Sequence, residues 1–427
     1  MEFWAFISLF TFDLLAPCKT SSSFRRFIVY LDQQYPYTPP NREHTTYITH
    51  VITAAASPAL FATDPGGQYK PFMSVREVRS RFFPRLEVCM SIGGPGDPQG
   101  FSKGAATNES RELFARNIAA TVERLGYDCV DINWKYPDID TFPLLLAQIK
   151  NEIGDRELSI AVPGRERDML AYTPENVKEI DEIVDFVNVM AYDFVDHRNS
   201  ATGHHTSMKE SRDCIQNYIR LGITPIKMNL GVAFHAKWFV TAPGQECQIK
   251  VGVGYFSIRF AVCRIAPLVN RDGTDTGMSG TMTFDAATFG PIPPLIMSPD
   301  ETCGTGTRFK CPGTSCCSQH GVCGKQPSHC GVGCQPGFGI CNGQTAKQSF
   351  MKALANKHYD WRYGAKWYWD SNGGIFWTWD TAFNMRRKLK RIVIPEGLGG
   401  MVISSIGQDS HDWHRLARLQ NKARMYF

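Results

Sequence analysis

Short runs of β-branched and aromatic residues alternate with amphipathic segments along most of the chain, and this alternation constrains the fold more than any other feature. The segments between the runs carry the apolar spacing of helices, at 109–125, 142–152, 175–182 and 208–221. Eight strands with helices between them, over this length, favour a closed (β/α)8 TIM barrel over an open sheet. The predicted strands are 27–31, 47–53, 86–92, 127–133, 157–162, 185–191, 226–233 and 401–406.

The alternation stops between the last two predicted strands. Residues 239 to about 365 are rich in Gly, Pro and Cys, and barrel loops usually have only about 2–6 residues. The stretch therefore predicts an inserted α+β subdomain, with 290–301 as a linker inside it. We expect the first seven barrel strands in 25–240, the insertion at 241–365, and the end of the insertion with the last barrel strand in 366–427.

The cysteines indicate the compartment. Eight of the 14 lie between Cys303 and Cys341, a density that means either disulfides or zinc. The adjacent Cys316 and Cys317, and the lack of paired C-x-x-C sets, argue against zinc. Disulfides need an oxidising compartment, so we expect a secreted, extracellular protein. The mostly apolar stretch from Phe3 to Leu15 then predicts a signal peptide at 1–22, although no Lys or Arg precedes this stretch.

Charge and hydropathy exclude other classes of partner. The net charge of +5 is small for 427 residues, and we interpret the basic run 386–391 as the solvated face of an outer helix rather than a nucleic-acid patch. Beyond the N-terminus, no apolar run approaches the ~20 residues of a membrane span. The Asn108-Glu109-Ser110 triplet is a potential glycosylation acceptor.

One predicted strand carries polar residues at alternate positions. Asp131, Asn133 and Lys135 are two apart, so they project to the same side of their strand. Barrel active sites lie at the carboxyl ends of strands. From the residues alone, this pattern is either a site in the barrel mouth or a buried polar pair that satisfies itself.

Two motifs stand at the ends of the third and fourth predicted strands, MSIGG at 90–94 and DCVDINWKYP at 128–137. They resemble glycoside hydrolase family 18, whose chitinases carry S-x-G-G on the third strand and D-G-x-D-x-D-W-E-Y-P on the fourth. Residues 189–193 and 400–409 agree with the sixth and eighth strands of the family. Three further segments of this chain, 202–206, 233–239 and 376–380, resemble the fungal killer-toxin-like members of the family.

The resemblance implies roles for single residues. In active members, a glutamic acid at the position of Lys135 protonates the glycosidic oxygen, and the substrate's own acetamido group then attacks. Asn133 replaces an aspartate that orients the acetamide, and the tyrosine matching Tyr192 hydrogen-bonds the acetamide carbonyl. Asp131 and Asp193 are retained. Sugar contacts are also implied for Ser91, Gly93, Met190, Trp377 and Ser404.

Lys135 is a poor replacement for the acid. An ammonium titrates near ~10.4, so it releases its proton reluctantly at neutral pH, and we expect it to pair with Asp131 or Asp193. Other departures affect the same site. Ser404 stands where the family has a tryptophan, His235 where it has a tyrosine, and Pro95 where fungal members have a tryptophan; the loop at 137–142 is short.

The cysteine cluster resembles the hevein-type chitin-binding module. This resemblance implies the pairs Cys303–Cys317, Cys311–Cys323, Cys316–Cys330 and Cys334–Cys341, and we also expect Cys247–Cys263. Ser318 matches the sugar-binding serine of the module. The three aromatic positions are occupied by His320, Val322 and His329, and each lost ring removes roughly 1 kcal/mol of stacking.

These observations favour a secreted, non-hydrolytic chitinase-like protein that binds chitin or chitooligosaccharides. One alternative is an active endo-chitinase that hydrolyses β-1,4-linked N-acetylglucosamine polymers. Another is a toxin-complex subunit or degenerate scaffold that is neither enzyme nor lectin. We expect no cofactor and no metal, and we expect residual glycan binding in the barrel cleft more than in the cysteine module.

Overall fold

The computed structural model describes residues 26–33, 40, 42–64, 66, 68–83, 85–94, 98–244, 247–251, 259–285, 289–410 and 412–426. The predicted signal peptide, Cys18 and Pro95 lie outside these ranges. Within them, none of the helices combines the length and the hydropathy needed to span a bilayer.

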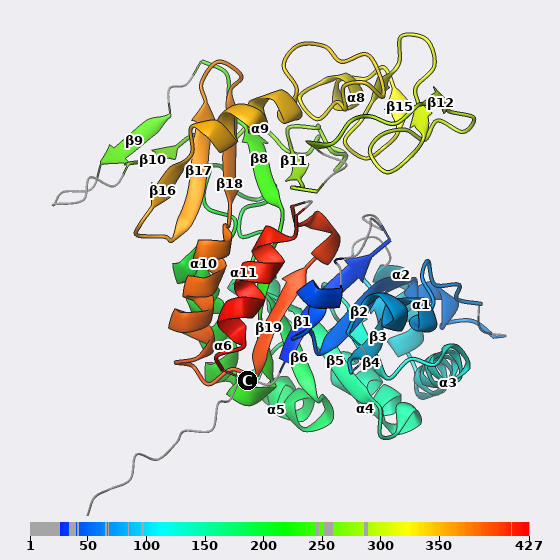
Figure 1. Ribbon diagram of the computed structural model, residues 1–427. Coiled ribbons are helices and arrows are strands. Elements are labelled where there is room, and N and C mark those ends of the chain that lie inside the picture. Colours follow the sequence, from blue (N-terminus) through cyan, green and yellow to red (C-terminus); the bar gives the residue numbers. More distant parts are fainter. Residues whose placement is uncertain are drawn as a thin grey trace, which may run out of the picture.

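Eight parallel strands close into a barrel, which confirms the predicted fold class (Figure 1). Around the barrel the order is β1-β19-β7-β6-β5-β4-β3-β2, so each barrel strand lies beside the barrel strand before it along the chain, and the last, β19, pairs with β1 to close the barrel. All eight predicted strands are present, with ends that differ by a few residues. They are β1 (Arg26–Asp32), β2 (His50–Ala56), β3 (Glu87–Gly93), β4 (Cys129–Asn133), β5 (Glu157–Pro163), β6 (Phe186–Met190), β7 (Met228–Ala233) and β19 (Gly400–Ser404).

Helices surround the barrel, and their ends follow local capping signals. The helix α3 (Asn108–Leu125) has Thr107 as its N-cap, whose side chain accepts a hydrogen bond from the Ser110 N–H, and Gly126 with φ of 75° as its C-cap. The four predicted helices are present within one residue at each end. The outer helices are α1 (Val75–Arg81), α2 (Pro98–Ala105), α3 (Asn108–Leu125), α4 (Phe142–Ile153), α5 (Pro174–Ile183), α6 (Met208–Leu221), α10 (Ala382–Lys388) and α11 (His414–Ala423).

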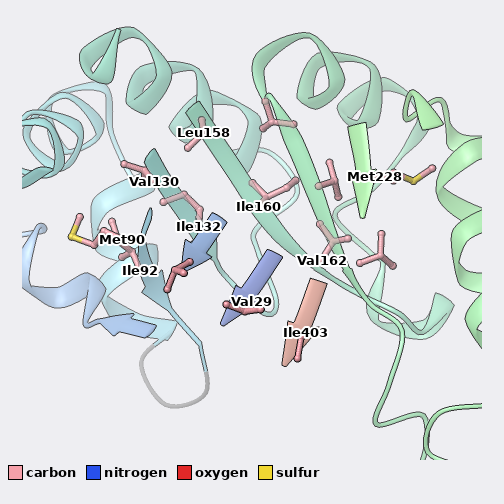
Figure 2. Packing of buried hydrophobic residues seen from close by; sticks show 14 of the residues in the cluster. Val29, Met90, Ile92, Val130, Ile132, Leu158, Ile160, Val162, Met228 and Ile403 are labelled. Carbon is pink, nitrogen blue, oxygen red and sulfur yellow. The ribbon is translucent and has the colours of Figure 1, made fainter. Parts of the chain in front are cut away.

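Alternation along the strands divides the core in two. Outward-facing residues such as Val29, Ile132 and Ile160, labelled in Figure 2, are fully buried in one cluster with residues of the outer helices. Inward-facing residues such as Ile28 and Cys129 fill the interior of the barrel in a separate cluster. Other inward positions carry buried polar side chains, among them Ser91, Asp131, Ser159 and Asn188.

The insertion begins a few residues before the expected position 241. Its antiparallel sheet, ordered β11-β8-β18-β17-β16, begins at Ala236 and ends at Trp379, within 366–427, where we expected the end of the insertion. The first and last long strands of the insertion pair with each other, so the chain leaves and re-enters the barrel at one place. The elements are β8 (Ala236–Val240), β11 (Ser279–Met282), α9 (Ala346–Ala355), β16 (His358–Asp360), β17 (Ala365–Asp370) and β18 (Ile375–Trp379), with a separate hairpin of β9 (Gln248–Val251) and β10 (Arg259–Val262).

Residues 303–341, here called the disulfide module, have little regular structure. Short pieces are β13 (Phe309–Lys310), β14 (Cys316–Cys317), β15 (Cys323–Gly324) and α8 (Pro327–Cys330), with β12 (Ile296–Met297) just before them. The structure contains all five predicted disulfides. A sixth, Cys89–Cys129, joins neighbouring positions of β3 and β4 and was not predicted. Cys214 is buried and unpaired among the described residues.

The basic run 386–391 differs from its expected solvated position. Lys388, at the end of α10, is fully buried, and its Nζ lies 2.7 Å from the equally buried carboxylate of Asp380. It also donates to the backbone oxygen of Thr206 at 2.7 Å. A charge pattern does not show which cation of a run turns inward, because that depends on a carboxylate distant in space.

Candidate functional site

Asp131 anchors a hydrogen-bond network inside the barrel. Its side chain is fully buried, and Oδ2 accepts from Tyr30 Oη at 2.9 Å and Ser91 Oγ at 2.8 Å. Oδ1 accepts from Ser159 Oγ at 2.7 Å and Asn188 Nδ2 at 3.3 Å. Burial raises the pKa of the Asp131 carboxyl, although these four donors oppose the shift. The carboxylate therefore ties five strands together and has no surface for a ligand.

The network continues away from the mouth. Asn188 Oδ1 accepts from Asn229 Nδ2 at 3.0 Å, and Asn229 Oδ1 accepts from Arg26 Nε at 3.0 Å. Sequence analysis missed Tyr30, Ser159, Asn188 and Asn229. Each of them is a polar residue at an inward-facing position of an otherwise apolar strand, and this pattern in the sequence could have identified them.

Gly93 lets the ends of β3 and β4 approach each other. Its φ is 99°, and an added Cβ would lie 2.5 Å from the backbone oxygen of Asn133. The next residue, Gly94, donates its N–H to that same oxygen at 2.8 Å. The role of Gly93 is thus a backbone role: it lets the half-buried Asn133 lie at the barrel mouth.

Lys135 points to solvent, and the prediction that it pairs with Asp131 or Asp193 is wrong. The side chain is exposed, with Nζ 5.4 Å from the ring centre of Tyr136. Among the described residues, no carboxylate forms an ion pair with it. The preceding Trp134 is buried instead, stacked 5.1 Å from Phe101. Lys135 cannot pair with Asp131, because Asp131 is sealed inside the barrel by neutral donors.

Asp193 follows β6 and lies among basic groups. Its Oδ1 is 3.2 Å from His205 Nδ1 and 3.1 Å from His235 Nε2, and its Oδ2 is 3.7 Å from Lys237 Nζ. Burial would raise the pKa of the Asp193 carboxyl, but the Lys237 and His235 charges and the two histidine hydrogen bonds hold it well below its ordinary value. Asp193 is therefore ionised at neutral pH, and its side chain is 41% exposed.

Three further predicted residues lie at the neighbouring strand ends. Met190 ends β6, Tyr192 follows it, and Ser404 ends β19; all three are half-buried. Burial raises the pKa of the Tyr192 phenol, and a hydrogen bond with Ser404 opposes the shift. The Tyr192 ring meets the edge of His235 at 6.2 Å between ring centres. The structure thus brings Tyr192, Asp193 and Ser404 together at one rim of the mouth.

Trp377 is not a sugar-binding face in this structure. Its side chain is 0% exposed, its indole N–H donates to Ser349 Oγ at 3.0 Å, and its ring stacks on Phe350 at 4.6 Å. Trp379 is 1% exposed and also contacts Phe350. Both tryptophans belong to the core between the insertion sheet and α9, so neither can stack on a sugar.

The four predicted site residues of the disulfide module lie outside the barrel and do not join the residues at its mouth. Ser318 is buried, and its Oγ accepts from the Val322 N–H at 3.2 Å; Val322 itself is exposed. His320 Nε2 lies 2.8 Å from Asp275 of the insertion, and His329 is half-buried against Gly324. In addition, Gln319 donates to the Ser279 backbone oxygen at 2.9 Å. The module therefore packs against the β11 edge of the insertion sheet, and His320 is engaged in that contact.

The predicted site residues include no available carboxylic acid. Asp131 is inaccessible, Asp193 is ionised, and Lys135 is a solvated cation. A general acid must carry a proton that it can release near the operating pH. The mouth can donate and accept hydrogen bonds.

The barrel and the motifs at its strand ends define a glycosidase-type (β/α)8 fold. Residues 26–409 match the model of glycosyl hydrolases family 18. The chain belongs to this family.

Curated relatives are chitinases that the chain matches only in part. It is 28% identical over 179 residues to sporulation-specific chitinase 2 of Saccharomyces cerevisiae, covering 36% of this chain and 34% of that protein. It is 23% identical over 274 residues to probable chitinase 2 of Drosophila melanogaster, covering 57% of this chain and 55% of the relative. The matches thus span about a third to a half of these relatives.

Solved structures share the whole fold. A mutant family 18 chitinase from Cycas revoluta, in complex with (GlcNAc)4, has a TM-score of 0.61 and 17% identity, covering 93% of this chain and 98% of its own. The chitinase-like agglutinin RobpsCRA from Robinia pseudoacacia has a TM-score of 0.58 and 17% identity, covering 94% and 99%. At such identity the likeness shows the fold alone.

Proposed function

We propose that this protein binds chitin or chitooligosaccharides without hydrolysing them. The observation that carries the proposal is the state of the strand-four end, where Lys135 is an exposed cation and the half-buried neighbour Asn133 has no charge. By resemblance, active members place an acid and its carboxylate partner at these two positions. Neither remaining carboxylate of the site, Asp131 or Asp193, can take over the acid's role.

Binding groups remain where the acid is lost. The Tyr192 hydroxyl, the Asp193 carboxylate and the Ser404 hydroxyl lie at adjoining strand ends, and such convergent polar groups suit the hydroxyls and acetamido group of a sugar. The Cycas revoluta chitinase was solved with (GlcNAc)4, and the Robinia pseudoacacia relative is named an agglutinin. Both names support a glycan ligand for this fold.

The disulfide module has a lesser role in this proposal. We assign it to the hevein type and the chain to the killer-toxin-like group, on the resemblances of their motifs. Val322 offers no ring for stacking, and His320 contacts Asp275. Six disulfides support secretion, because such bridges persist in oxidising compartments.

A binding isotherm with soluble chitopentaose tests where the glycan binds. Tyr192→Phe should weaken binding about fivefold, since one hydrogen bond contributes about 1 kcal/mol. Tyr368→Phe, on the insertion sheet, is the matched control and should change nothing. His320→Ala with Val322→Ala should have little effect. If this double variant abolishes binding while Tyr192→Phe does not weaken it, the module is the functional part and the barrel is a scaffold.

A reducing-end assay tests the absence of turnover. The unmodified protein should release no product, and Lys135→Glu alone should restore little, because Asn133 and Ser404 remain. Lys135→Glu, Asn133→Asp and Ser404→Trp together should exceed the sum of their single effects, with positioned acid catalysis contributing about 10²–10⁴-fold. Efficient hydrolysis by the unmodified chain would instead establish an active chitinase.

A further inference from the structure

Two histidines and one carboxylate converge at the rim of the barrel mouth. Asp193 follows β6, His205 precedes α6, and His235 follows β7. One potential ligand atom from each lies within 4.8 Å of the other two. We propose that these three side chains bind a single divalent transition-metal ion, with Zn²⁺ the best match. The proposal does not depend on glycan binding.

The spacing of the ligand atoms fits zinc. Ligands about 2.0–2.1 Å from Zn²⁺, at tetrahedral angles, lie about 3.3–3.4 Å from one another. Asp193 Oδ1 is 3.2 Å from His205 Nδ1 and 3.1 Å from His235 Nε2. Imidazole nitrogen and carboxylate oxygen are both normal zinc ligands. Small movements of these side chains would therefore admit the ion.

The hydrogen bonds of His235 require a positive charge between its ring and Asp193. Gln408 Oε1 accepts from the Ser405 N–H at 2.9 Å, which turns the oxygen of this amide toward His235 Nδ1, 3.1 Å away. Nδ1 therefore carries a proton, so the unprotonated nitrogen of a neutral ring would be Nε2, facing a carboxylate oxygen. A second proton or a metal ion must lie there. An Nδ1–H bonded to a fixed oxygen is also the usual support of a zinc-binding histidine.

His205 can present its Nδ1 to a metal ion. The ring is fully buried, and Nδ1 lies 3.2 Å from Asp193 Oδ1, so without a metal this nitrogen donates its proton to the carboxylate. Nε2 has no hydrogen-bond partner among the described residues, so it can carry the proton when a metal ion takes Nδ1. The Asp193 side chain is 41% exposed, so an ion held here would keep an open position for water or for an oxygen of a ligand.

The charge of Lys237 disfavours binding of the metal ion, so a variant without this charge distinguishes a metal site from a pair of protonated histidines. Its Nζ lies 3.7 Å from Asp193 Oδ2, the carboxylate oxygen not shared by the histidines. A nearby ammonium repels a divalent cation. Removing this charge in Lys237→Met should therefore tighten metal binding about tenfold or more. It should do nothing if the histidines only hold protons.

The experiment is calorimetric titration of ZnCl2 into the full chain after treatment with a chelator. We expect one Zn²⁺ per chain, tighter binding in Lys237→Met, and loss of at least tenfold in affinity in Asp193→Asn and in His235→Gln. The matched control is His320→Gln, which removes a lone histidine that faces a carboxylate at 2.8 Å without a second histidine. It should leave binding unchanged.

Two results would overturn the proposal. One is the absence of stoichiometric Zn²⁺ binding to both the unmodified protein and Lys237→Met. The other is a His235 ring whose ¹⁵N NMR signals show two protons and do not change with added Zn²⁺. Both measurements use natively folded protein, so the proposal is still tested if a histidine variant fails to fold.

Discussion

The barrel and the disulfide module reach stable folds by opposite means. The barrel buries large apolar side chains on both sides of its strands, and many of them are fully inaccessible to solvent. The clusters of the module consist almost entirely of cysteines, with Phe338 as the one large buried side chain among them. About 40 residues cannot bury enough apolar surface unaided, so covalent bridges replace the core.

The same contrast separates their candidate sites. The barrel mouth collects Tyr192, Asp193 and Ser404 from strands far apart in sequence and supports them on a rigid interior. The module offers side chains from one local segment, and His320 among them contacts Asp275.

Reduction should separate the two regions most strongly. Each native bridge of the module stabilises it by about 2–5 kcal/mol, so breaking all four should unfold residues 303–341 while the barrel stays folded. Limited proteolysis under a mild reductant should then cut within the module first. The variant Cys247→Ser with Cys263→Ser is the control, because its bridge lies outside the module. A module that stays resistant after full reduction would contradict this account.

The second largest effect should come from the joint between barrel and insertion. Lys388→Met leaves the buried Asp380 carboxylate without its cation, which should lower the free energy of unfolding by about 3–5 kcal/mol. Urea denaturation measures the loss. Lys390→Met, two residues along and exposed, should change stability by less than about 0.5 kcal/mol. Equal effects of the two changes would show that burial of Lys388 is unimportant.

The barrel bridge offers a direct comparison with the module. Cys89→Ala with Cys129→Ala should lower the free energy of unfolding by about 2–4 kcal/mol, yet the barrel should keep its fold because its apolar core remains. Circular dichroism and urea denaturation together separate fold from stability. Unfolding of the double variant at room temperature would mean that this barrel also depends on a covalent bridge.

Acid should produce the smallest effect, and only in the barrel. Burial raises the pKa of Asp168 and of Asp196, but Arg198 and Arg165 outweigh it and hold both pKa values below the ordinary range. These ion pairs therefore stabilise the fold above the ordinary carboxyl pKa of about 3.9, and this contribution is lost as the pH falls through the lower folded values.

Melting temperatures at a series of pH values measure the contribution of these ion pairs to stability. The barrel transition should fall as the pH drops below about 4, and Asp196→Asn should flatten that fall. The module has no comparable cluster of buried carboxylates among its described residues, so its protease resistance should depend less on pH. A module that opens in acid before the barrel melts would reverse the comparison.

Much of this architecture could be predicted from local patterns. Strand alternation and the apolar spacing of helices each act over a few residues, so the eight strands and four helices occur where predicted. The four bridges of the module occur as the resemblance to the hevein type implied, and Cys247–Cys263 occurs as expected. The start of the insertion at Ala236 did not follow from local patterns, because pairing of β8 with β18 joins residues more than a hundred positions apart. Trp377 was misplaced for a related reason: alternation does not tell which side of a sheet a helix will cover.

By itself, the sequence determined the class of fold, the covalent framework of the module and the identity of the groups at the end of β4, where Lys135 and Asn133 stand. These depend on spacing and on the chemistry of single residues. Only the tertiary structure decided which polar groups meet. Closure of the barrel brings the ends of β6 and β7 together, so Asp193 lies 3.1 Å from His235, 42 positions away. It also seals Asp131 inside and leaves Lys135 in solvent, because burial depends on the path of the whole chain.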